Sequence, residues 1–286
     1  SPSEHYLVAR FDPGRTGVPA ETGVVILKTT FTTEERLAHF AADEALRRAD
    51  EGCYPRVVAE LSASAGADVV MAVPGVRNLD GLRGRTVAVE ATTVGALMLQ
   101  RLLQAARLRP ADVRVMNVEA TQHVALLRDG RAEVAVSYEP LASALREVGC
   151  VPIFDSRQMP GDIVDVLLVH ADVLGARAAQ VQALVAGWQR GLAAVEQEPD
   201  ASAALLAPGA DLTPAQYLAS FRGLDFYDAR QSLALLSGEP KALGQASERL
   251  AITLQTMGLI HESPDWGRLL APEPAKRLMQ AQGAGA

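Results

Sequence analysis

Residues 78–95 read NLDGLRGRTVAVEATTVG and point to the fold class of this 286-residue chain. The first seven residues are rich in glycine, asparagine and aspartate, which favour a turn. Thr86–Val89 is apolar or β-branched and predicts a buried strand. Thr92 or Thr93 then offers a hydroxyl cap for a helix whose apolar residues recur at helical spacing. A turn, a strand and a helix in this order predict one βα unit.

The same pattern recurs on both sides of this segment. We expect strands at residues 24–28, 57–61, 67–73, 113–118, 134–136, 151–154 and 164–169, and helices that begin near residues 33, 93, 120 and 140. Alternating strands and helices predict βαβ crossovers and a mostly parallel sheet. After His170 the apolar residues follow a helical period, which predicts a largely helical last third with Trp188 in its core.

The composition excludes several classes of protein. Apolar residues make up 49% and charged residues 21%, an ordinary globular mix that argues against disorder. The formal net charge of −7 argues against a nucleic-acid partner, since such binding needs a positive face. The apolar runs are far shorter than the roughly 20 residues of a membrane-spanning helix. We therefore expect an acidic globular protein of two domains.

Cysteine and histidine carry no sign of a metal or redox centre. Cys53 and Cys150 each follow a glycine before an expected strand, and we interpret them as small buried side chains rather than a disulfide. The five histidines are scattered without ligand spacing, so we expect no metal and no cofactor. No nucleophile elbow, phosphate loop or dinucleotide fingerprint occurs, and we expect no catalytic residues and no enzymatic activity.

Three segments together carry a family resemblance: residues 66–72 (GADVVMA), residues 78–90 and the turn Ser137–Pro140 (SYEP). They resemble the nitrate/sulfonate/taurine-type substrate-binding proteins of ABC importers, a family that also includes binders of the thiamine pyrimidine precursor. Typical members carry a D-L-K-G-K-x-V-A-V strand and a W-E-P turn. Here Gly81 stands in place of the aspartate, Arg83 and Arg85 in place of the lysines, and Tyr138 in place of the tryptophan.

The resemblance implies an α/β type II periplasmic-binding-protein fold, with two α/β lobes joined by two hinge strands. Lobe 1 would hold residues 1–74 and 170–286, including the C-terminal helices, and lobe 2 would be the inserted α/β domain of residues 75–169. Such a protein is a periplasmic or lipid-anchored monomer that captures a small organic solute by hinge closure. The solute would be a sulfonate, a pyrimidine precursor or a related molecule, handed on to an ABC transporter permease in the membrane.

Two other functions stay open. The thiamine-pyrimidine synthases are enzymes that resemble these binders, but they carry a cysteine-rich motif that is missing here. The second alternative is the ligand-sensing module of a transcription regulator, although no helix-turn-helix precedes the sheet and the charge is acidic.

The expected ligand-binding residues follow the carboxyl ends of strands, where open α/β sheets bind their ligands. Four internal loops and the N-terminal segment contribute, and the candidates are His5, Tyr6, Ser62, Ser64, Thr92, Thr93, Asn117, Tyr138 and Glu139. Each has a plainer interpretation as a turn, cap or terminal residue. An anionic solute would also need a basic side chain, and the sequence places none at the site.

Tyr138 and Glu139 form the strongest pair. Tyr138 could stack on a ring of the solute or close over a small one, and Glu139 could accept hydrogen bonds from an amine or amidine. The alternative is that Tyr138 packs at the edge of the site and Glu139 only favours the start of the next helix.

The N-terminal region departs from the family pattern. Ser1–Tyr6 resembles the loop after a first strand, without the strand itself. Around residues 40–42 the family shows a short strand, whereas here we expect either that the helix beginning at Thr33 continues or that a segment is absent.

Overall fold

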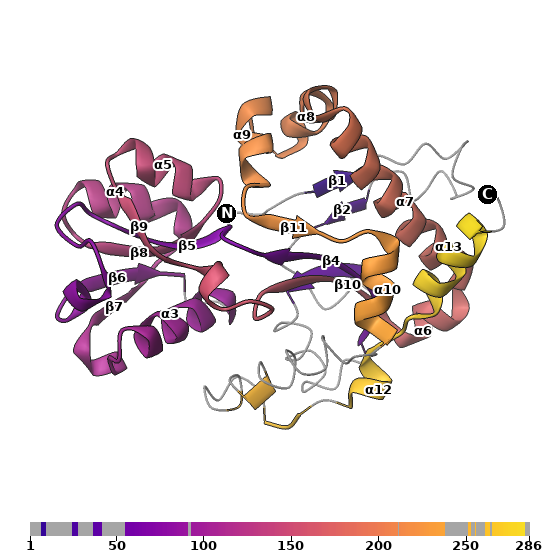
Figure 1. Cartoon of the computed structure of the whole chain (residues 1–286), viewed down its shortest axis with the longest axis horizontal. Coiled ribbons are helices and arrows are strands. Elements are labelled where there is room, and N and C mark those ends of the chain that lie inside the picture. The colour runs from indigo at the N-terminus through magenta and orange to yellow at the C-terminus, as the bar shows by residue number, and fades with distance from the viewer. Residues whose placement is uncertain are drawn as a thin grey trace. The chain divides into compact units, whose positions relative to one another are not determined.

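The computed structural model describes residues 7–9, 25–27, 37–41, 55–90, 93–210, 212–237, 251–252, 255, 261–263 and 265–283 (Figure 1). Contacts along the backbone divide the chain into two compact units. Unit 1 contains Ser64–Ile163 and Leu218–Asp225, and unit 2 contains the described parts of residues 4–63, 164–217 and 226–286. The lobe boundaries expected at residues 74/75 and 169/170 stay a prediction about the functional domains.

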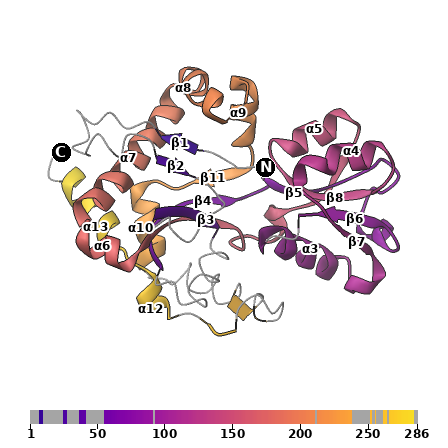
Figure 2. The same ribbon diagram turned by 180° about the vertical axis from the view of Figure 1, so that it is seen from behind.

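Unit 1 is built on a five-stranded sheet in the order β7-β6-β8-β5-β9 (Figure 1, and from behind in Figure 2). The strands are β5 (Asp68–Ala72), β6 (Thr86–Val89), β7 (Arg114–Asn117), β8 (Val134–Tyr138) and β9 (Val151–Asp155). β6 pairs in parallel with β7 and β8, whereas β5 lies antiparallel between β8 and β9.

The prediction of a mostly parallel sheet is therefore wrong for the strand pairs of β5. The physical reason is the connection from β5 to β6: residues 73–85 hold only a short 3-10 turn, and parallel strands need a longer crossover, usually a helix. The βα units that begin at β6 do run in one direction, with helices α3 (Thr93–Ala105), α4 (His123–Arg128) and α5 (Leu141–Glu147) between their strands.

The core of unit 1 lies between these helices and the sheet. On α3, Leu97, Met98 and Leu102 are fully buried, as their helical spacing predicts. On the strands, Met71, Ala88 and Ala135 are buried in one apolar cluster that also holds side chains of the helices: Leu126, Leu127, Ala142 and Leu145. Short 3-10 turns, η2 (Leu79–Leu82), η3 (Pro110–Asp112), η4 (Ala120–Gln122) and η5 (Ser156–Gln158), complete the connections.

Unit 2 carries a four-stranded sheet in the order β11-β4-β10-β3, with β4 at Pro55–Ser64, β10 at Val164–His170 and β11 at Leu224–Phe226, whose first two residues belong to unit 1. β10 is antiparallel to both β3 and β4. A separate antiparallel pair joins β1 (Leu7–Ala9) and β2 (Val25–Leu27). The described residues of this unit after His170 are mostly helical, as predicted. The helices are α6 (Ala171–Ala176), α7 (Ala178–Gln197), α8 (Pro199–Leu206), α9 (Pro214–Ser220), α10 (Ala229–Ser237), α12 (Trp266–Leu269) and α13 (Glu273–Gly283), with the 3-10 turn η6 (Ala207–Ala210). The last residues of α9 belong to unit 1.

The core of unit 2 centres on α7. Trp188 is buried there among side chains of α7, β4 and β10, which confirms its predicted core position. Among the residues that the structure describes, no helix is long and apolar enough to cross a membrane.

One expectation near the N-terminus is corrected. Residues 37–41, which were expected to lie in a helix or to mark a gap, form strand β3 (Leu37–Ala41) instead. β3 pairs antiparallel with β10, Leu37 opposite Val169 and Ala41 opposite Asp165. Pairing with a buried strand overrides the weak helix signal of a five-residue segment. The short strand of the family pattern is therefore present.

Candidate functional site

The strands of unit 1 bring the candidate residues to one edge of the sheet. Because β6, β7 and β8 are parallel, their carboxyl ends lie at the same edge. β5 begins there, since Asp68 is opposite Tyr138, and β9 ends there, since Asp155 is next to Val69. We call this the site edge. Its predicted members are Ser64, Thr93, Asn117, Tyr138 and Glu139.

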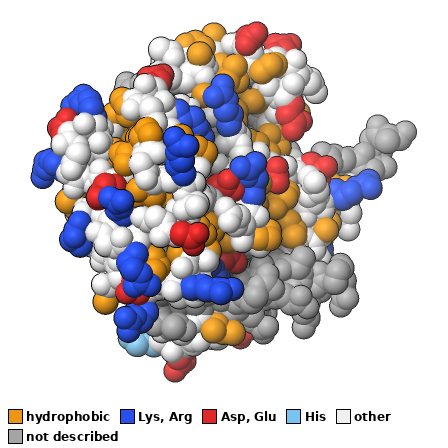
Figure 3. Space-filling model, turned by 60° about the vertical axis from the view of Figure 1, so that its left-hand side comes forward, with side chains coloured by type: hydrophobic (Ala, Val, Ile, Leu, Met, Phe, Trp, Pro, Cys, Tyr) orange, Lys and Arg blue, Asp and Glu red, His pale blue; other side chains and the backbone are white. Residues whose placement is uncertain are grey.

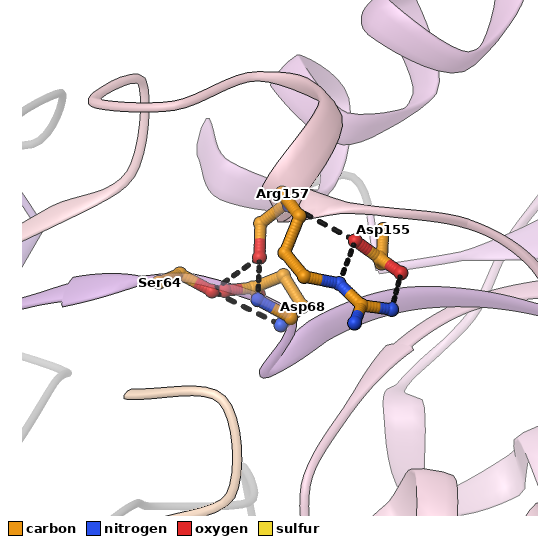
Figure 4. A network of polar contacts seen from close by, with 6 residues as sticks. Ser64, Asp68, Asp155 and Arg157 are labelled. Carbon is orange, nitrogen blue, oxygen red and sulfur yellow. Dashed lines mark hydrogen bonds and ion pairs between the residues drawn. The ribbon is translucent and has the colours of Figure 1, made fainter. Parts of the chain in front are cut away.

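A hydroxyl network fixes the loop between β4 and β5 (Figure 4). The Oγ atoms of Ser64 and Ser156 are 2.8 Å apart and share a hydrogen bond. Ser156 Oγ accepts from the Gly66 N–H at 2.7 Å, and Ser64 Oγ accepts from the Asp68 N–H at 3.1 Å. Both serine side chains are almost completely buried. Ser64 therefore acts first as a structural residue of this loop.

The remaining amides of the loop also have acceptors. Ala65 N–H and Ala67 N–H both donate to the Gly223 carbonyl, at 2.6 and 3.1 Å, and Ser64 N–H donates to Ile163. Gly223 has φ +77°, and a Cβ atom there would lie 2.4 Å from Ala67 N, so only glycine fits. Every N–H group of residues 64–68 therefore has an acceptor within the protein, and this loop offers no free N–H to a ligand. Gly223 was missed because its partner loop lies far away in the sequence.

Arg157 brings a positive charge to the site edge. Its Nε and Nη2 groups donate to the two carboxylate oxygens of Asp155 at 3.0 and 2.6 Å, and its backbone N–H donates to Asp155 Oδ1 at 2.9 Å, so that Asp155 caps the turn η5 (Figure 4). These hydrogen bonds hold the pKa of Asp155 below its usual range. The guanidinium side chain is still 70% exposed. Sequence reasoning found no basic residue here, because nothing in the spacing marks Arg157.

The Glu139 carboxylate is bonded to residues of the helix that follows it, α5. This buried carboxylate accepts from Ser143 N–H at 3.1 Å and from Ser143 Oγ at 2.7 Å, and it pairs with Arg146. The Glu139 N–H donates to Ala67 O at 3.2 Å. Glu139 thus links the start of α5 to the β4–β5 loop. The neighbouring Tyr138, half-buried at the end of β8, is the residue whose position this link fixes.

The other candidates divide into three groups. Thr93 is the first residue of α3, and Asn117 is the exposed last residue of β7. Ser62 belongs to unit 2, where its hydroxyl donates to Asp165 Oδ2 at 2.7 Å across β4 and β10, so the structure does not bring it to the site edge. His5, Tyr6 and Thr92 lie outside the described residues.

Nothing in the described part of the chain resembles a metal centre of three or more His, Cys, Asp or Glu side chains. Cys150 is a buried free thiol just before β9, at the opposite edge of the sheet, and burial raises its pKa. Cys53 lies outside the described residues.

Comparison with solved structures identifies the fold. The periplasmic aliphatic sulphonate-binding protein SsuA from Escherichia coli matches with a TM-score of 0.68 and 17% identity, covering 84% of this chain and 77% of SsuA. The alkanesulfonate-binding protein SsuA from Xanthomonas axonopodis pv. citri, bound to MOPS, matches with a TM-score of 0.66 and 14% identity over 83% and 80% of the two chains. The desulfurization enzyme DszB matches with a TM-score of 0.66 and 17% identity over 88% of both chains.

At the level of sequence, no protein of curated function matches the chain. The model of the NMT1-like family does match, over residues 48–207, which is more than half of the chain and includes β4 through α8. With this match and the fold of the SsuA proteins, the resemblance drawn from residues 66–72, 78–90 and 137–140 is confirmed. The chain is a member of the NMT1-like family and has the α/β fold of type II periplasmic binding proteins.

Proposed function

We propose that this protein is an extracytoplasmic solute-binding protein of an ABC importer, periplasmic or lipid-anchored and monomeric. The observation that carries the proposal is the gathering of Thr93, Asn117, Tyr138 and Arg157 at the carboxyl ends of the strands of unit 1. Ligands of open α/β sheets bind at such an edge. The solute is a small organic molecule, such as a sulfonate or a pyrimidine precursor.

Each side chain at the site edge has a distinct task. Tyr138 offers a flat apolar face to the solute, and Asn117 offers an amide that both donates and accepts. Arg157 supplies the positive charge that an anionic group requires. Glu139, Ser64 and Ser156 make no direct contact in this scheme and instead hold the loops in place, so that little ordering is needed on binding.

Binding is coupled to hinge closure of the two units. The chain passes between them at residues 63/64, 163/164, 217/218 and 225/226. A solute that binds the closed form more tightly shifts the population toward that form, which the permease then recognises.

The fold likeness to DszB supports a second candidate, an enzyme on the same scaffold, as does the resemblance to thiamine-pyrimidine synthases. Cys150 is buried at the far edge of the sheet, so this cysteine supplies no thiol at the site edge. Conversion of a bound solute into a product would favour this candidate over transport.

A thermal-shift screen tests the proposed function. A solute present at about 100 times its dissociation constant adds roughly 2.7 kcal/mol of stability and raises the melting temperature. We expect one member of a panel of alkanesulfonates, nitrate, pyrimidines, amino acids and aromatic acids to do so. A panel that leaves the melting temperature unchanged throughout would contradict the proposal.

Substitution of Tyr138 then tests the site. We expect Tyr138→Ala to weaken binding of the solute by at least about tenfold, because a buried aromatic contact of this kind is a typical hot spot. Tyr138→Phe keeps the ring and should bind nearly as well as wild type in isothermal titration calorimetry. Equal affinity of all three proteins would remove Tyr138 from the site.

A further inference from the structure

The edge of the unit 1 sheet opposite the site edge is rich in arginine. β6, β7, β8 and β9 begin there and β5 ends there. The segments at this edge are residues 74–86, 107–114, 128–134 and 147–151, and they contain eight arginines, five carboxylates and no lysine. Eight positive against five negative charges leave an excess of three, in a chain whose formal net charge is −7. We call these four segments the basic edge.

The arginines of the basic edge remain open to solvent. Arg83 and Arg109 share Asp112, at 2.5 and 3.5 Å, yet their side chains are 64% and 83% exposed. Arg77, Arg107 and Arg131 are exposed and form no ion pair with any residue that the structure describes. Three helices end at this edge, and their C-terminal dipoles favour nearby cations. That local preference does not explain why so many guanidinium groups point outward.

Exposed apolar side chains lie at the same edge. Val148 and Val151 are 40% and 36% exposed, and Val115, the next residue along β7 after the segment 107–114, is 46% exposed; they are three of the five large apolar side chains exposed in the described part of the chain. Figure 3 turns this side of unit 1 toward the viewer, and blue Lys and Arg side chains recur on it beside orange apolar ones. Cationic and apolar groups on one face are the combination that interfacial membrane binding requires.

We propose that the basic edge binds the headgroups of anionic phospholipids at a membrane surface. Guanidinium groups bind phosphate oxygens in a bidentate manner, which a lysine cannot do. Neighbouring strands are about 4.8 Å apart, so the five-stranded edge extends about 20 Å and fits a flat, extended surface better than a single acidic loop. The site edge stays free when the protein is bound in this way. The inference does not depend on which solute the protein carries.

Vesicle co-sedimentation of the full chain tests the inference. At about 50 mM salt, where surface charges are weakly screened, we expect the protein to sediment with vesicles of phosphatidylcholine that contain phosphatidylglycerol, and not with phosphatidylcholine alone. The triple variant Arg77→Gln, Arg107→Gln, Arg131→Gln should lose on the order of 100-fold in partitioning, about fivefold for each arginine near the surface.

A matched control distinguishes an effect of the basic edge on vesicle binding from an effect of the protein's net charge. The triple variant Arg177→Gln, Arg190→Gln, Arg230→Gln removes the same charge from exposed positions of unit 2, and it should partition like wild type. Circular dichroism must show that both variants are folded. Equal losses in the two triples, or no preference for anionic vesicles, would overturn the proposal. Binding to immobilised polyglutamate but not to vesicles would also overturn it, in favour of an acidic protein partner.

Discussion

Ser156 shows how one buried hydroxyl stabilises the site edge. Its Oγ accepts from the Gly66 N–H and bonds to Ser64 Oγ, and the residue is 1% exposed. Ser156→Ala would leave the Gly66 N–H without its acceptor, and an unsatisfied buried polar group costs about 1–3 kcal/mol. We therefore expect a loss of that size in the free energy of unfolding, measured with denaturant.

Ser202→Ala is the matched control for this loss. The Ser202 hydroxyl donates to Ala194 O at an exposed position of α8, where water can replace the contact. Its removal should change the free energy of unfolding by less than about 0.5 kcal/mol. Similar effects of the two substitutions would mean that the Ser64–Ser156 network contributes nothing special.

At this scale the sequence predicted positions better than roles. Ser64, Asn117 and Tyr138 are the last residues of their strands and lie at the site edge, as the predicted order of the strands implied. The role of Glu139 could have been read differently, because Ser143 and Arg146 follow it at helical spacing on one face. The Ser64–Ser156 hydrogen bond joins residues 92 positions apart. No local pattern reveals such a pair.

Helix α3 depends on a glycine in its first turn. A Cβ atom on Gly95 would lie 2.0 Å from the Glu90 carbonyl oxygen, which belongs to the backbone and cannot move aside cheaply. Gly95→Ala should therefore displace the start of α3 and weaken solute binding at the site edge, with a loss of stability of at least about 1–3 kcal/mol. Denaturant unfolding and calorimetry of the same variant measure both effects.

Gly175 provides the comparison, since it also lies in a helix, α6, and nothing lies within 4 Å of its Cβ position. Gly175→Ala should be neutral or stabilise the protein by up to about 1 kcal/mol through helix propensity. If Gly95→Ala behaved in the same way, the close approach of α3 to Glu90 would not be a real constraint.

Elements with a strong local signal were predicted well, and elements defined by distant partners were not. β6 has the predicted bounds, and α3 begins at one of its two predicted caps. β3 was missed because Leu37–Ala41 is short and its identity comes from pairing with β10, more than 120 positions away in the chain. The direction of β5 was missed because periodicity does not encode strand polarity.

Two buried titratable groups, one in each unit, make the folding stability of the molecule depend on pH. Glu60 on β4 in unit 2 is 2% exposed, and burial raises its pKa from 4.5 to about 8. The folded state therefore disfavours the carboxylate: its contribution to stability is complete below pH 4.5 and is lost as the pH rises to 8. His123 on α4 in unit 1 is fully buried, and burial lowers its pKa from 6.5 to about 4. Its contribution is complete above pH 6.5 and is lost as the pH falls to 4.

These opposite signs predict different pH profiles for the two units. Each group contributes a slope of up to about 1.4 kcal/mol per pH unit within its window. The chain has two tryptophans, Trp188 and Trp266, and both belong to unit 2. Intrinsic fluorescence therefore reports the melting of unit 2, whereas far-ultraviolet circular dichroism reports both units. We expect the fluorescence melting temperature to fall between pH 6.5 and 8, and this fall to be absent in Glu60→Gln.

The acid side provides the complementary test. As the pH falls from 6.5 to 4.5, the dichroism transition that fluorescence does not report, that of unit 1, should move to lower temperature in wild type. His123→Gln should flatten that slope without altering the fluorescence profile on the alkaline side. Only the slopes are compared, because glutamine at a buried site changes the absolute stability as well. If His123→Gln changed the fluorescence slope below pH 6.5, the two units would have to unfold as one cooperative body. If Glu60→Gln left the fall of the fluorescence melting temperature between pH 6.5 and 8 intact, the titration of Glu60 would not be its cause.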